Sequence, residues 1–283
     1  MKVPIILDGV VVSASAALLR SLTPGVLSGR GVFETMLAQD GKIVLLEMHL
    51  ARFKKGLRYL KILSPWALSV LKENLYESLR LNRLRGARIR LMAWERKGRT
   101  HWAIVTLPYR AYTFPQYRRG FSAGISGIRR NEGSPLTRIK SLDYHSFRRA
   151  LQKAQENGFD EALLLNRKGY WVEGSLSNIF FWKGRKLYTP KLSCGCLDGV
   201  TRRIVIQIAQ RLNIPVKQVR AEREELFSAD EAFLTNSLMG IMPLTRVQGR
   251  KIGNGRCGGT TIKLIKEYRR LIQKDVDYSP SQM

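Results

Sequence analysis

The most informative segment of this sequence is Arg138-Ile139-Lys140-Ser141-Leu142-Asp143-Tyr144, which stands just ahead of a predicted helix. A lysine in such a place is usually a surface residue. A lysine that forms a Schiff base must instead be neutral, and burial or nearby cations favour that form. Arg138 could supply such a charge. The segment alone is compatible with both interpretations, so the rest of the chain has to decide between them.

A second segment of interest is Val172-Glu173-Gly174-Ser175-Leu176-Ser177-Asn178-Ile179-Phe180-Phe181. Glu173 lies between two apolar runs typical of strands, so its carboxylate is either solvated at a strand end or directed into a cleft. A carboxylate in a cleft can keep a heterocyclic nitrogen protonated, which makes an aromatic cofactor a better electron acceptor. Both interpretations stay open from the residues alone.

Two further segments have the composition of an anion-binding site. Leu197-Asp198-Gly199-Val200-Thr201-Arg202-Arg203 directly precedes a helix, where backbone amides bind anions and a glycine permits close approach. Leu234-Thr235-Asn236-Ser237-Leu238-Met239-Gly240-Ile241-Met242-Pro243 carries a strand into a hydroxyl-rich loop. An ordinary helix N-cap and a polar turn are the alternative explanations of these two segments.

The apolar pattern predicts alternating strands and helices in two α/β domains. The expected strands are residues 43–46, 88–92, 102–107, several runs between 161 and 189, and 232–235. The expected helices are residues 47–60, one from Phe147 that ends at Gly158, one from about Thr201, and one from about Thr260. A polar, loosely held tail is expected over residues 274–283. The stretch from Pro108 to Arg118 has no clear period, and we place a small domain at 1–111, a linker at 112–119 and a larger, cofactor-binding domain at 120–283.

Composition restricts the class of protein. The chain has 283 residues of which 44% are hydrophobic, enough for two ordinary cores. No run approaches about 18 apolar residues, so no membrane span is expected. Cys194, Cys196 and Cys257 form no disulfide framework and favour a reduced, cytoplasmic setting. With the histidines scattered along the chain, no metal site is predicted.

The charge is the unusual bulk feature, because 49 Lys and Arg face 22 Asp and Glu, for a formal net charge of +27. Such a field attracts anions, and nucleic acid is the first partner to consider. The basic residues are nevertheless spread along the chain and form no basic tail or known nucleic-acid motif. We expect a small anionic substrate; a basic nucleic-acid-binding protein on a degenerate enzyme fold is the alternative from another class.

In their order and spacing, the four segments resemble the fold-type-IV pyridoxal-phosphate enzymes, which include branched-chain aminotransferases, D-amino-acid aminotransferases and 4-amino-4-deoxychorismate lyases. The resemblance extends from Gly29 to about Gly253. It begins with Gly29-Arg30-Gly31-Val32-Phe33-Glu34-Thr35, where Arg30 replaces the usual Asp, and continues with His49-Leu50-Ala51-Arg52. It implies an α/β (α+β) fold with a small α/β domain, a larger domain with a barrel-like sheet, pyridoxal 5'-phosphate between the two, and a homodimer.

The resemblance also implies roles for single residues. Lys140 would be the Schiff-base lysine, and Tyr144 would lie near the phenolic oxygen of the cofactor. Glu173 would pair with the pyridine nitrogen, with Asn178 in support. The phosphate would be held by Arg52, Gly199, Val200, Thr201 and Ser237. His49 is expected to be a structural helix residue.

The loop Thr235-Asn236-Ser237-Leu238-Met239-Gly240-Ile241-Met242-Pro243 resembles the lyases most. The favoured activity is therefore a carbon–oxygen lyase of folate biosynthesis, which converts 4-amino-4-deoxychorismate to 4-aminobenzoate and pyruvate. Lys140 would act as acid and base, and either Thr35 or Lys140 would protonate the departing pyruvate. Arg90 and Tyr109 are candidates for binding the substrate carboxylates, with a surface role as the alternative for each. Aminotransfer with branched-chain or D-amino acids is the closest rival activity.

Overall fold

The computed structural model describes residues 2–27, 29–64 and 66–277, with side chains up to residue 273. The chain divides into two compact units. Unit 1 consists of Met1–Arg110, Ile139–His145 and Ile272–Met283, and unit 2 of Ala111–Arg138 and Ser146–Leu271. The segment that contains Lys140 thus belongs to unit 1, although unit 2 flanks it in the sequence. Both units combine sheet and helices, so the predicted α/β class is confirmed.

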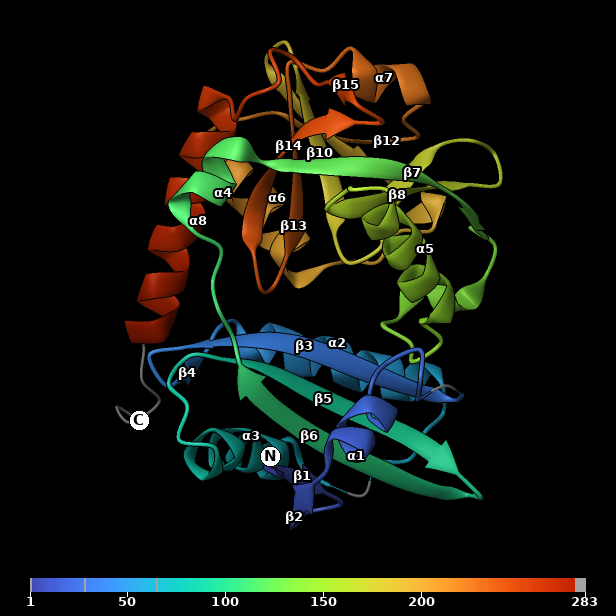
Figure 1. Cartoon of the computed structure of the whole chain (residues 1–283), viewed down its shortest axis with the longest axis vertical. Helices are drawn as coiled ribbons and strands as arrows, with labels where there is room; N and C mark the ends of the chain where they lie inside the picture. Colours follow the sequence, from blue (N-terminus) through green and yellow to red (C-terminus); the bar gives the residue numbers. More distant parts are fainter. Residues whose placement is uncertain (1, 28, 65, 278–283) are drawn as a thin grey trace. The chain divides into compact units, whose positions relative to one another are not determined.

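Unit 1 is built on a six-stranded antiparallel sheet in the order β2-β1-β6-β5-β3-β4 (Figure 1). Its strands are β1 (Val3–Leu7), β2 (Val10–Ala14), β3 (Gly31–Gln39), β4 (Lys42–Ile43), β5 (Ala87–Arg96) and β6 (Arg99–Pro108). Its helices are α1 (Ala16–Ser21), α2 (Leu46–Tyr59) and α3 (Leu68–Leu81). Helix α2 packs on β3, and α3 packs on β6 and β1.

The residues of β3 alternate between two environments, because successive side chains of a strand point to opposite faces. Glu34 and Met36 are fully buried, whereas Thr35 and Leu37 are partly exposed. The predicted helix at 47–60 is confirmed by α2. The predicted strand at 43–46 is wrong beyond its first residue, since Leu45 adopts a left-handed φ of 54° and α2 begins directly after it.

The segment around Lys140 lies along the first residues of β3. Phe33 N donates to Lys140 O at 2.9 Å, and Leu142 N donates to Gly31 O at 3.0 Å. A Cβ atom at residue 31 would lie 2.5 Å from Leu142 Cδ1 and 2.6 Å from the carbonyl oxygen of Ala93. The pairing therefore depends on the absence of a side chain at Gly31.

Unit 2 is built on a nine-stranded sheet in the order β12-β11-β10-β13-β14-β7-β8-β9, with β15 paired to β14. The strands are β7 (Phe121–Arg130), β8 (Glu161–Asn166), β9 (Trp171–Gly174), β10 (Asn178–Lys183), β11 (Lys186–Pro190), β12 (Val216–Val219), β13 (Glu231–Asn236), β14 (Gly240–Val247) and β15 (Arg250–Lys251). Although β9 ends the order, it lies against β10 and β11. The sheet therefore curls back on itself, and the predicted barrel-like sheet is confirmed.

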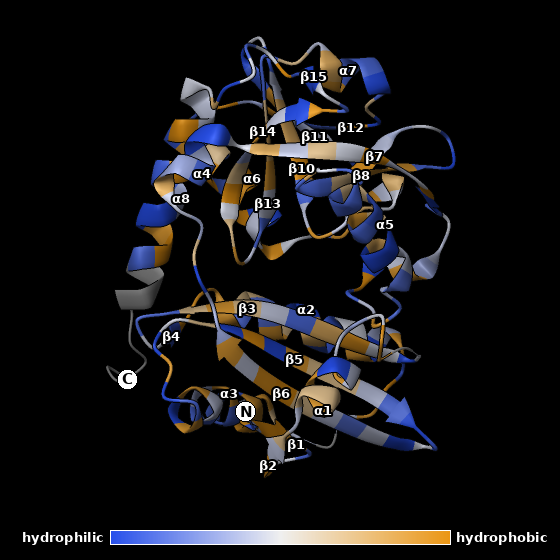
Figure 2. Cartoon of the chain, viewed as in Figure 1, coloured by the Kyte–Doolittle hydropathy of each residue, from blue (hydrophilic) through white to orange (hydrophobic). Residues whose placement is uncertain are grey.

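The helices of unit 2 differ in how they meet the sheet. They are α4 (Phe114–Arg119), α5 (His145–Glu156), α6 (Val200–Arg211), α7 (Arg223–Phe227) and α8 (Gly259–Asp277), with 3-10 turns at Pro135–Arg138 and Leu192–Cys194. Figure 2 shows α5 as mainly hydrophilic, with only Phe147, Ala150 and Ala154 buried. Helix α6 packs on β13 and buries most of its first two turns.

The ends of the predicted domains contain more regular structure than expected. The predicted linker at 112–119 includes α4, in which Thr113 and Gln116 form a capping box. Helix α8 continues through Asp277, so the first four residues of the predicted loose tail are helical, and 278–283 lie outside the described residues. The domain limits at 112–119 stay a prediction. Within the described ranges, no helix is both long and apolar enough to cross a lipid bilayer.

We expect Gly31→Ala to lower the free energy of unfolding by about 1–3 kcal/mol, because the new methyl group would push Leu142 and a β5 carbonyl apart. Gly86→Ala is the matched control, since a Cβ there meets no atom within 4 Å. Urea unfolding of both variants measures the difference. Equal stability of the two would contradict the close approach.

Candidate active site

Lys140 is half-buried against two aromatic rings of unit 1. Its Nζ lies 4.5 Å from the ring centroid of Phe33 and 5.5 Å from that of Tyr144. The two rings meet edge to face at 5.2 Å, so each fixes the other. Arg138, the cation expected to assist Lys140, is instead exposed. Lys140 therefore has a defined environment and is not a fully solvated surface lysine.

Thr35 and Arg90 share one face of the six-stranded sheet with Phe33. Thr35 lies two residues after Phe33 on β3, and Arg90 is its Cα partner on β5. Arg90 Nη1 donates to Leu22 O at 3.2 Å and to Thr23 Oγ1 at 3.3 Å. The structure therefore places Thr35 and Arg90 beside the ring that contacts Lys140.

Tyr109 is one residue beyond the end of β6 and is half-buried. The strand register does not place it with Thr35 and Arg90. Its predicted role in substrate binding stays a prediction.

Arg52 belongs to a buried charged cluster with Glu34 and His49. Arg52 Nε and Nη2 donate to the two oxygens of Glu34 at 2.8 and 2.7 Å, and His49 Nδ1 lies 2.7 Å from Glu34 Oε2. Burial alone would raise the pKa of Glu34, but the charge and hydrogen bonds of Arg52, aided by His49, lower it to about 2. Glu34 is thus an anion that orients the Arg52 guanidinium.

His49 is neutral in this cluster. Burial is the main cause that lowers its pKa, and the charges of Arg52 and Lys140 act in the same direction, against the hydrogen bond to Glu34. A neutral ring that donates through Nδ1 satisfies Glu34 without adding charge.

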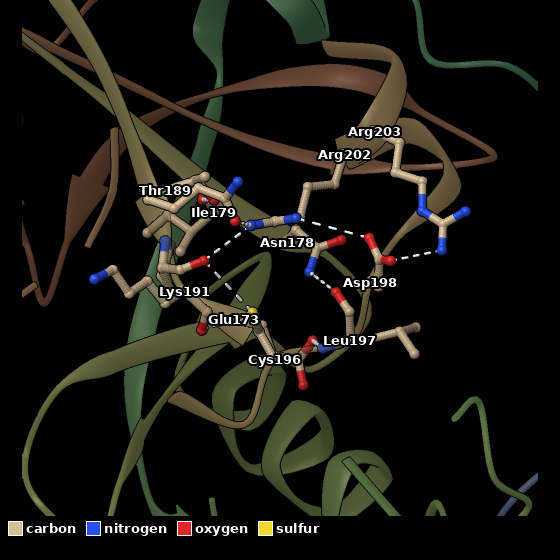
Figure 3. Close-up of polar contacts among 12 residues, drawn as sticks. Glu173, Asn178, Ile179, Thr189, Lys191, Cys196, Leu197, Asp198, Arg202 and Arg203 are labelled. Carbon is tan, nitrogen blue, oxygen red and sulfur yellow. Dashed lines mark hydrogen bonds and ion pairs between the residues drawn. The ribbon is translucent and has the colours of Figure 1, made fainter. Parts of the chain in front are cut away.

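In unit 2, Glu173 and Asn178 hold the backbone of the same residue, Leu197, at its N–H and at its C=O. Glu173 Oε2 accepts a hydrogen bond from Leu197 N at 2.9 Å, and Asn178 Nδ2 donates to Leu197 O at 2.8 Å. Figure 3 shows both side chains directed toward Leu197. Arg130 Nε lies 3.5 Å from Glu173 Oε1. Glu173 is therefore a buried carboxylate with a fixed orientation, and the alternative of a solvated strand end is wrong.

The peptide held in this way leads directly into α6. The N-cap of α6 is Gly199, which has no side chain to cap the first amides, and Val200 and Thr201 begin the helix fully buried. A Cβ at residue 199 would lie 2.1 Å from Asn178 Oδ1. Thr201 Oγ1 is buried and has no hydrogen-bond partner among the residues that the structure describes. Open amides, a glycine and a buried hydroxyl fit an anion such as a phosphate.

A second buried hydroxyl lies on the neighbouring strand. Thr235 on β13 is the Cα partner of Asn178 on β10, and within the described ranges its Oγ1 also has no hydrogen-bond partner. Asn236 Oδ1 accepts hydrogen bonds from Leu238 N and Met239 N at 3.0 and 2.9 Å, which fixes the turn that contains the half-buried Ser237. This turn thus has a defined shape, as a phosphate-binding loop requires.

Comparison with known proteins identifies the family of this chain. The family model described as amino-transferase class IV matches residues 31–247, a span that includes all of the candidate site residues from Glu34 to Ser237. The chain belongs to the class IV aminotransferases.

Relatives of this class IV chain have more than one named activity. A branched-chain-amino-acid aminotransferase of Pseudomonas aeruginosa is 33% identical over 94% of this chain and 91% of the relative. An aminodeoxychorismate lyase of Bacillus subtilis is 31% identical over 91% and 90%. Among solved structures, a T.th. branched-chain amino acid aminotransferase with pyridoxamine 5'-phosphate has a TM-score of 0.86 and 28% identity, with 96% of this chain and 94% of that chain covered.

One departure of this class IV sequence from the family pattern has a structural explanation. Arg30 donates to the carbonyl oxygens of Leu60 and Lys61 and pairs with Glu95 at 3.2 Å. It therefore closes the C-terminal end of α2, where a cation interacts favourably with the last carbonyls. The replacement of the usual Asp stabilises the helix that carries Arg52.

The sequence reasoning missed four residues of this class IV site. They are Glu34, Arg130, Thr235 and Leu197. Glu34, Thr235 and Leu197 stand inside quoted segments, and a search for buried polar side chains could have found the first two. Leu197 acts through its backbone, and Arg130 acts on a carboxylate far away in the sequence, so no local pattern indicates either role.

We expect Glu34→Gln to lower the free energy of unfolding at pH 7 by about 3–5 kcal/mol, because it leaves the buried Arg52 without its counterion. The pKa of Glu34 is lowered from 4.5 to about 2, so the ionised carboxylate stabilises the fold above about pH 4.5 and this contribution is lost as the pH falls toward 2. The difference between wild type and variant should shrink across that window. Urea unfolding at a series of pH values measures it.

Glu95→Gln is the control, because Glu95 pairs with a half-exposed arginine and its loss should cost less than about 1 kcal/mol. A similar loss in both variants at pH 7 would contradict the role given to the buried cluster.

Proposed function

We propose that this chain is a pyridoxal-phosphate-dependent lyase that converts 4-amino-4-deoxychorismate to 4-aminobenzoate and pyruvate, with Lys140 as the lysine that binds the cofactor. Pyridoxal phosphate is the cofactor of this family, and a structural neighbour at 28% identity is described with its amine form. The lyase of Bacillus subtilis and the lyase-like loop from Thr235 to Pro243 support the choice of reaction.

The residues of unit 2 fit the phosphate and ring of this cofactor. The open amides at the start of α6 and the hydroxyls of Thr201 and Thr235 can all donate to phosphate oxygens. Ser237 and the amides of its turn are further candidates. Glu173 is a buried carboxylate that could favour a proton on the ring nitrogen, and Asn178 keeps the loop beside it in place. In unit 1, Arg52 is the candidate to bind the phosphate, and Tyr144 is the candidate to contact the phenolic oxygen of the cofactor.

One observation carries the proposal. Thr35 and Arg90 lie on the same face of the sheet as Phe33, whose ring contacts Lys140. Lys140 can act as a base, the Thr35 hydroxyl can donate a proton, and Arg90 can bind a carboxylate. A lyase that releases pyruvate needs all three functions.

When bound, pyridoxal phosphate supplies a carbonyl carbon that links to amines and a ring that withdraws electrons from the substrate. Lys140, released by the substrate amine, removes the proton from the amine-bearing ring carbon. As the bond between the ring carbon and the ether oxygen breaks, the oxygen leaves with the enolpyruvyl group, and Thr35 or Lys140 would deliver a proton to its methylene carbon to give pyruvate. Glu173 would face the ring nitrogen and favour its protonated form, and Arg90 would orient a substrate carboxylate.

Aminotransfer is the second candidate, because the Pseudomonas aeruginosa relative and the structural neighbour with pyridoxamine 5'-phosphate are both named branched-chain aminotransferases. Lys140 and Glu173 would have the same roles in that reaction. The difference is that Lys140 would return the proton to the cofactor carbon, and a keto acid would then be needed to complete the cycle.

The setting of the enzyme is also a proposal. Cys194, Cys196 and Cys257 are free thiols, which is typical of a reducing compartment, so we propose that the chain works in the cytoplasm. We also propose a homodimer, which the resemblance to the family implies. The formal net charge of +27 favours anionic ligands, so we propose a small anionic substrate.

We expect the purified protein to show an absorbance band near the visible edge that borohydride removes, with the reduced adduct on Lys140. Mass spectrometry of a digest locates the adduct. Lys140→Ala should lose it, whereas Lys153→Ala, which removes an exposed lysine of α5, should keep it. An adduct on another lysine would contradict the assignment.

We expect repeated turnover of 4-amino-4-deoxychorismate without any added keto acid, with release of 4-aminobenzoate and pyruvate in equal amounts. Chromatography of both products over many enzyme equivalents measures this. If release stops after one equivalent and resumes when a keto acid is added, the chain is an aminotransferase.

A further inference from the structure

Glu161, the first residue of β8, is a buried carboxylate that the proposed reaction does not use. Its oxygens accept hydrogen bonds from three backbone amides and two hydroxyls. The donors are Ala162 N at 2.8 Å, Ser175 N at 3.1 Å, Ser175 Oγ, Leu176 N at 3.2 Å and Ser177 Oγ at 2.9 Å. In the part of the chain that the structure describes, no lysine, arginine or histidine forms an ion pair with it. A carboxyl group buried among neutral donors is costly to keep away from water, so its place in the fold needs an explanation.

Most of these donors belong to one turn. Ser175, Leu176 and Ser177 connect β9 to β10, and four of the five hydrogen bonds to Glu161 come from them. A Cβ at residue 174 would lie 2.3 Å from Ser177 Oγ and 2.9 Å from Glu161 Oε2. Gly174 is therefore needed for the turn to close over the carboxylate. The carboxylate of Glu161 thus fixes the conformation of this turn through four hydrogen bonds.

The two ends of the turn carry the side chains that hold Leu197. Glu173 directly precedes Gly174, and Asn178 directly follows Ser177. Glu173 is also the Cα partner of Leu164, on the strand that Glu161 begins. The turn therefore joins the end of β9, where Glu173 is the last residue but one, to Asn178, the first residue of β10. Both Glu173 and Asn178 contact the peptide that leads into α6.

We propose that Glu161 is a positioning residue that sets the orientation of Glu173 and Asn178 through the turn at 174–177. It touches neither substrate nor cofactor itself. This inference rests on the proposed function, because it assigns Glu173 to the ring nitrogen and the start of α6 to the phosphate. Burial raises the pKa of Glu161, and the hydrogen bonds from the turn act in the opposite direction.

Glu161→Gln tests the proposal, because it keeps the shape of the side chain but places an amide donor against neighbouring donors. The matched control is Glu231→Gln. Glu231 likewise accepts hydrogen bonds from two amides and one hydroxyl, at Thr260 and Thr261, but it caps the start of α8 and not the turn. Both variants should lose stability, so stability alone does not distinguish a positioning role from a structural one.

Two measurements distinguish them. In the cofactor-free chain, hydrogen exchange of the Leu197 amide should become at least about tenfold faster in Glu161→Gln and stay unchanged in Glu231→Gln. In the loaded enzyme, the cofactor absorbance band should shift in Glu161→Gln alone, and kcat should fall on the order of 100-fold, as expected for a misplaced reacting group. Unchanged exchange at Leu197 in a folded Glu161→Gln protein would overturn the proposal, as would an unshifted band.

The outcomes also separate this inference from the proposed function. A wild-type protein that binds no pyridoxal phosphate would overturn the proposed function, while the exchange of Leu197 would still show whether Glu161 controls the turn. If Glu161→Gln does not fold, Ser177→Ala removes one donor to Glu161, and Thr261→Ala removes the equivalent donor to Glu231. Faster exchange at Leu197 is then expected only for Ser177→Ala, and the same rate in both would overturn the proposal.

Discussion

The hydrogen bonds that Glu173 and Asn178 make to Leu197 are the constraint on which the larger unit depends. They hold the N–H and the C=O of one residue, so the chain that enters α6 has little rotational freedom. A backbone fixed at both polar groups places the next amides in defined positions without a capping side chain. The open start of α6 is therefore preorganised, and an anion that binds there need not order the loop first.

The smaller unit uses a different solution to hold a cation. Glu34 is buried next to Arg52, and the removal of two such ions from water costs several kcal/mol for each. Two hydrogen bonds to Arg52 and one contact with His49 offset this cost and remove most freedom from the guanidinium. In both units a buried carboxylate orients a second polar group, which is a side chain in one case and the backbone of a loop in the other.

Much of the fold was predictable, because the spacing of apolar residues along the chain indicates which face of a helix or strand is buried. The helices α2, α5, α6 and α8 each have an apolar stripe, and the curled sheet followed from a resemblance in motif order. The end of the strand before Leu45 was missed, because a run of apolar residues is equally compatible with a strand and with a buried turn that leads into a helix. The pairing of the Lys140 segment with β3 was not predictable, since the partners are about a hundred residues apart. For the same reason, periodicity identified Glu173 as a candidate but could not identify its contact, which is an amide at residue 197.

The close approach of Gly199 to Asn178 has a consequence for how this family can vary. A methyl group at residue 199 would overlap the amide oxygen of residue 178, which itself holds the preceding peptide. An alanine at residue 199 would therefore require the side chain of residue 178 to turn away or to be shorter. The constraint acts in one direction, because a shorter residue at 178 leaves room beside Gly199. Either change would release the carbonyl oxygen of Leu197 from Asn178, and the chain that enters α6 would then have to be held by other means.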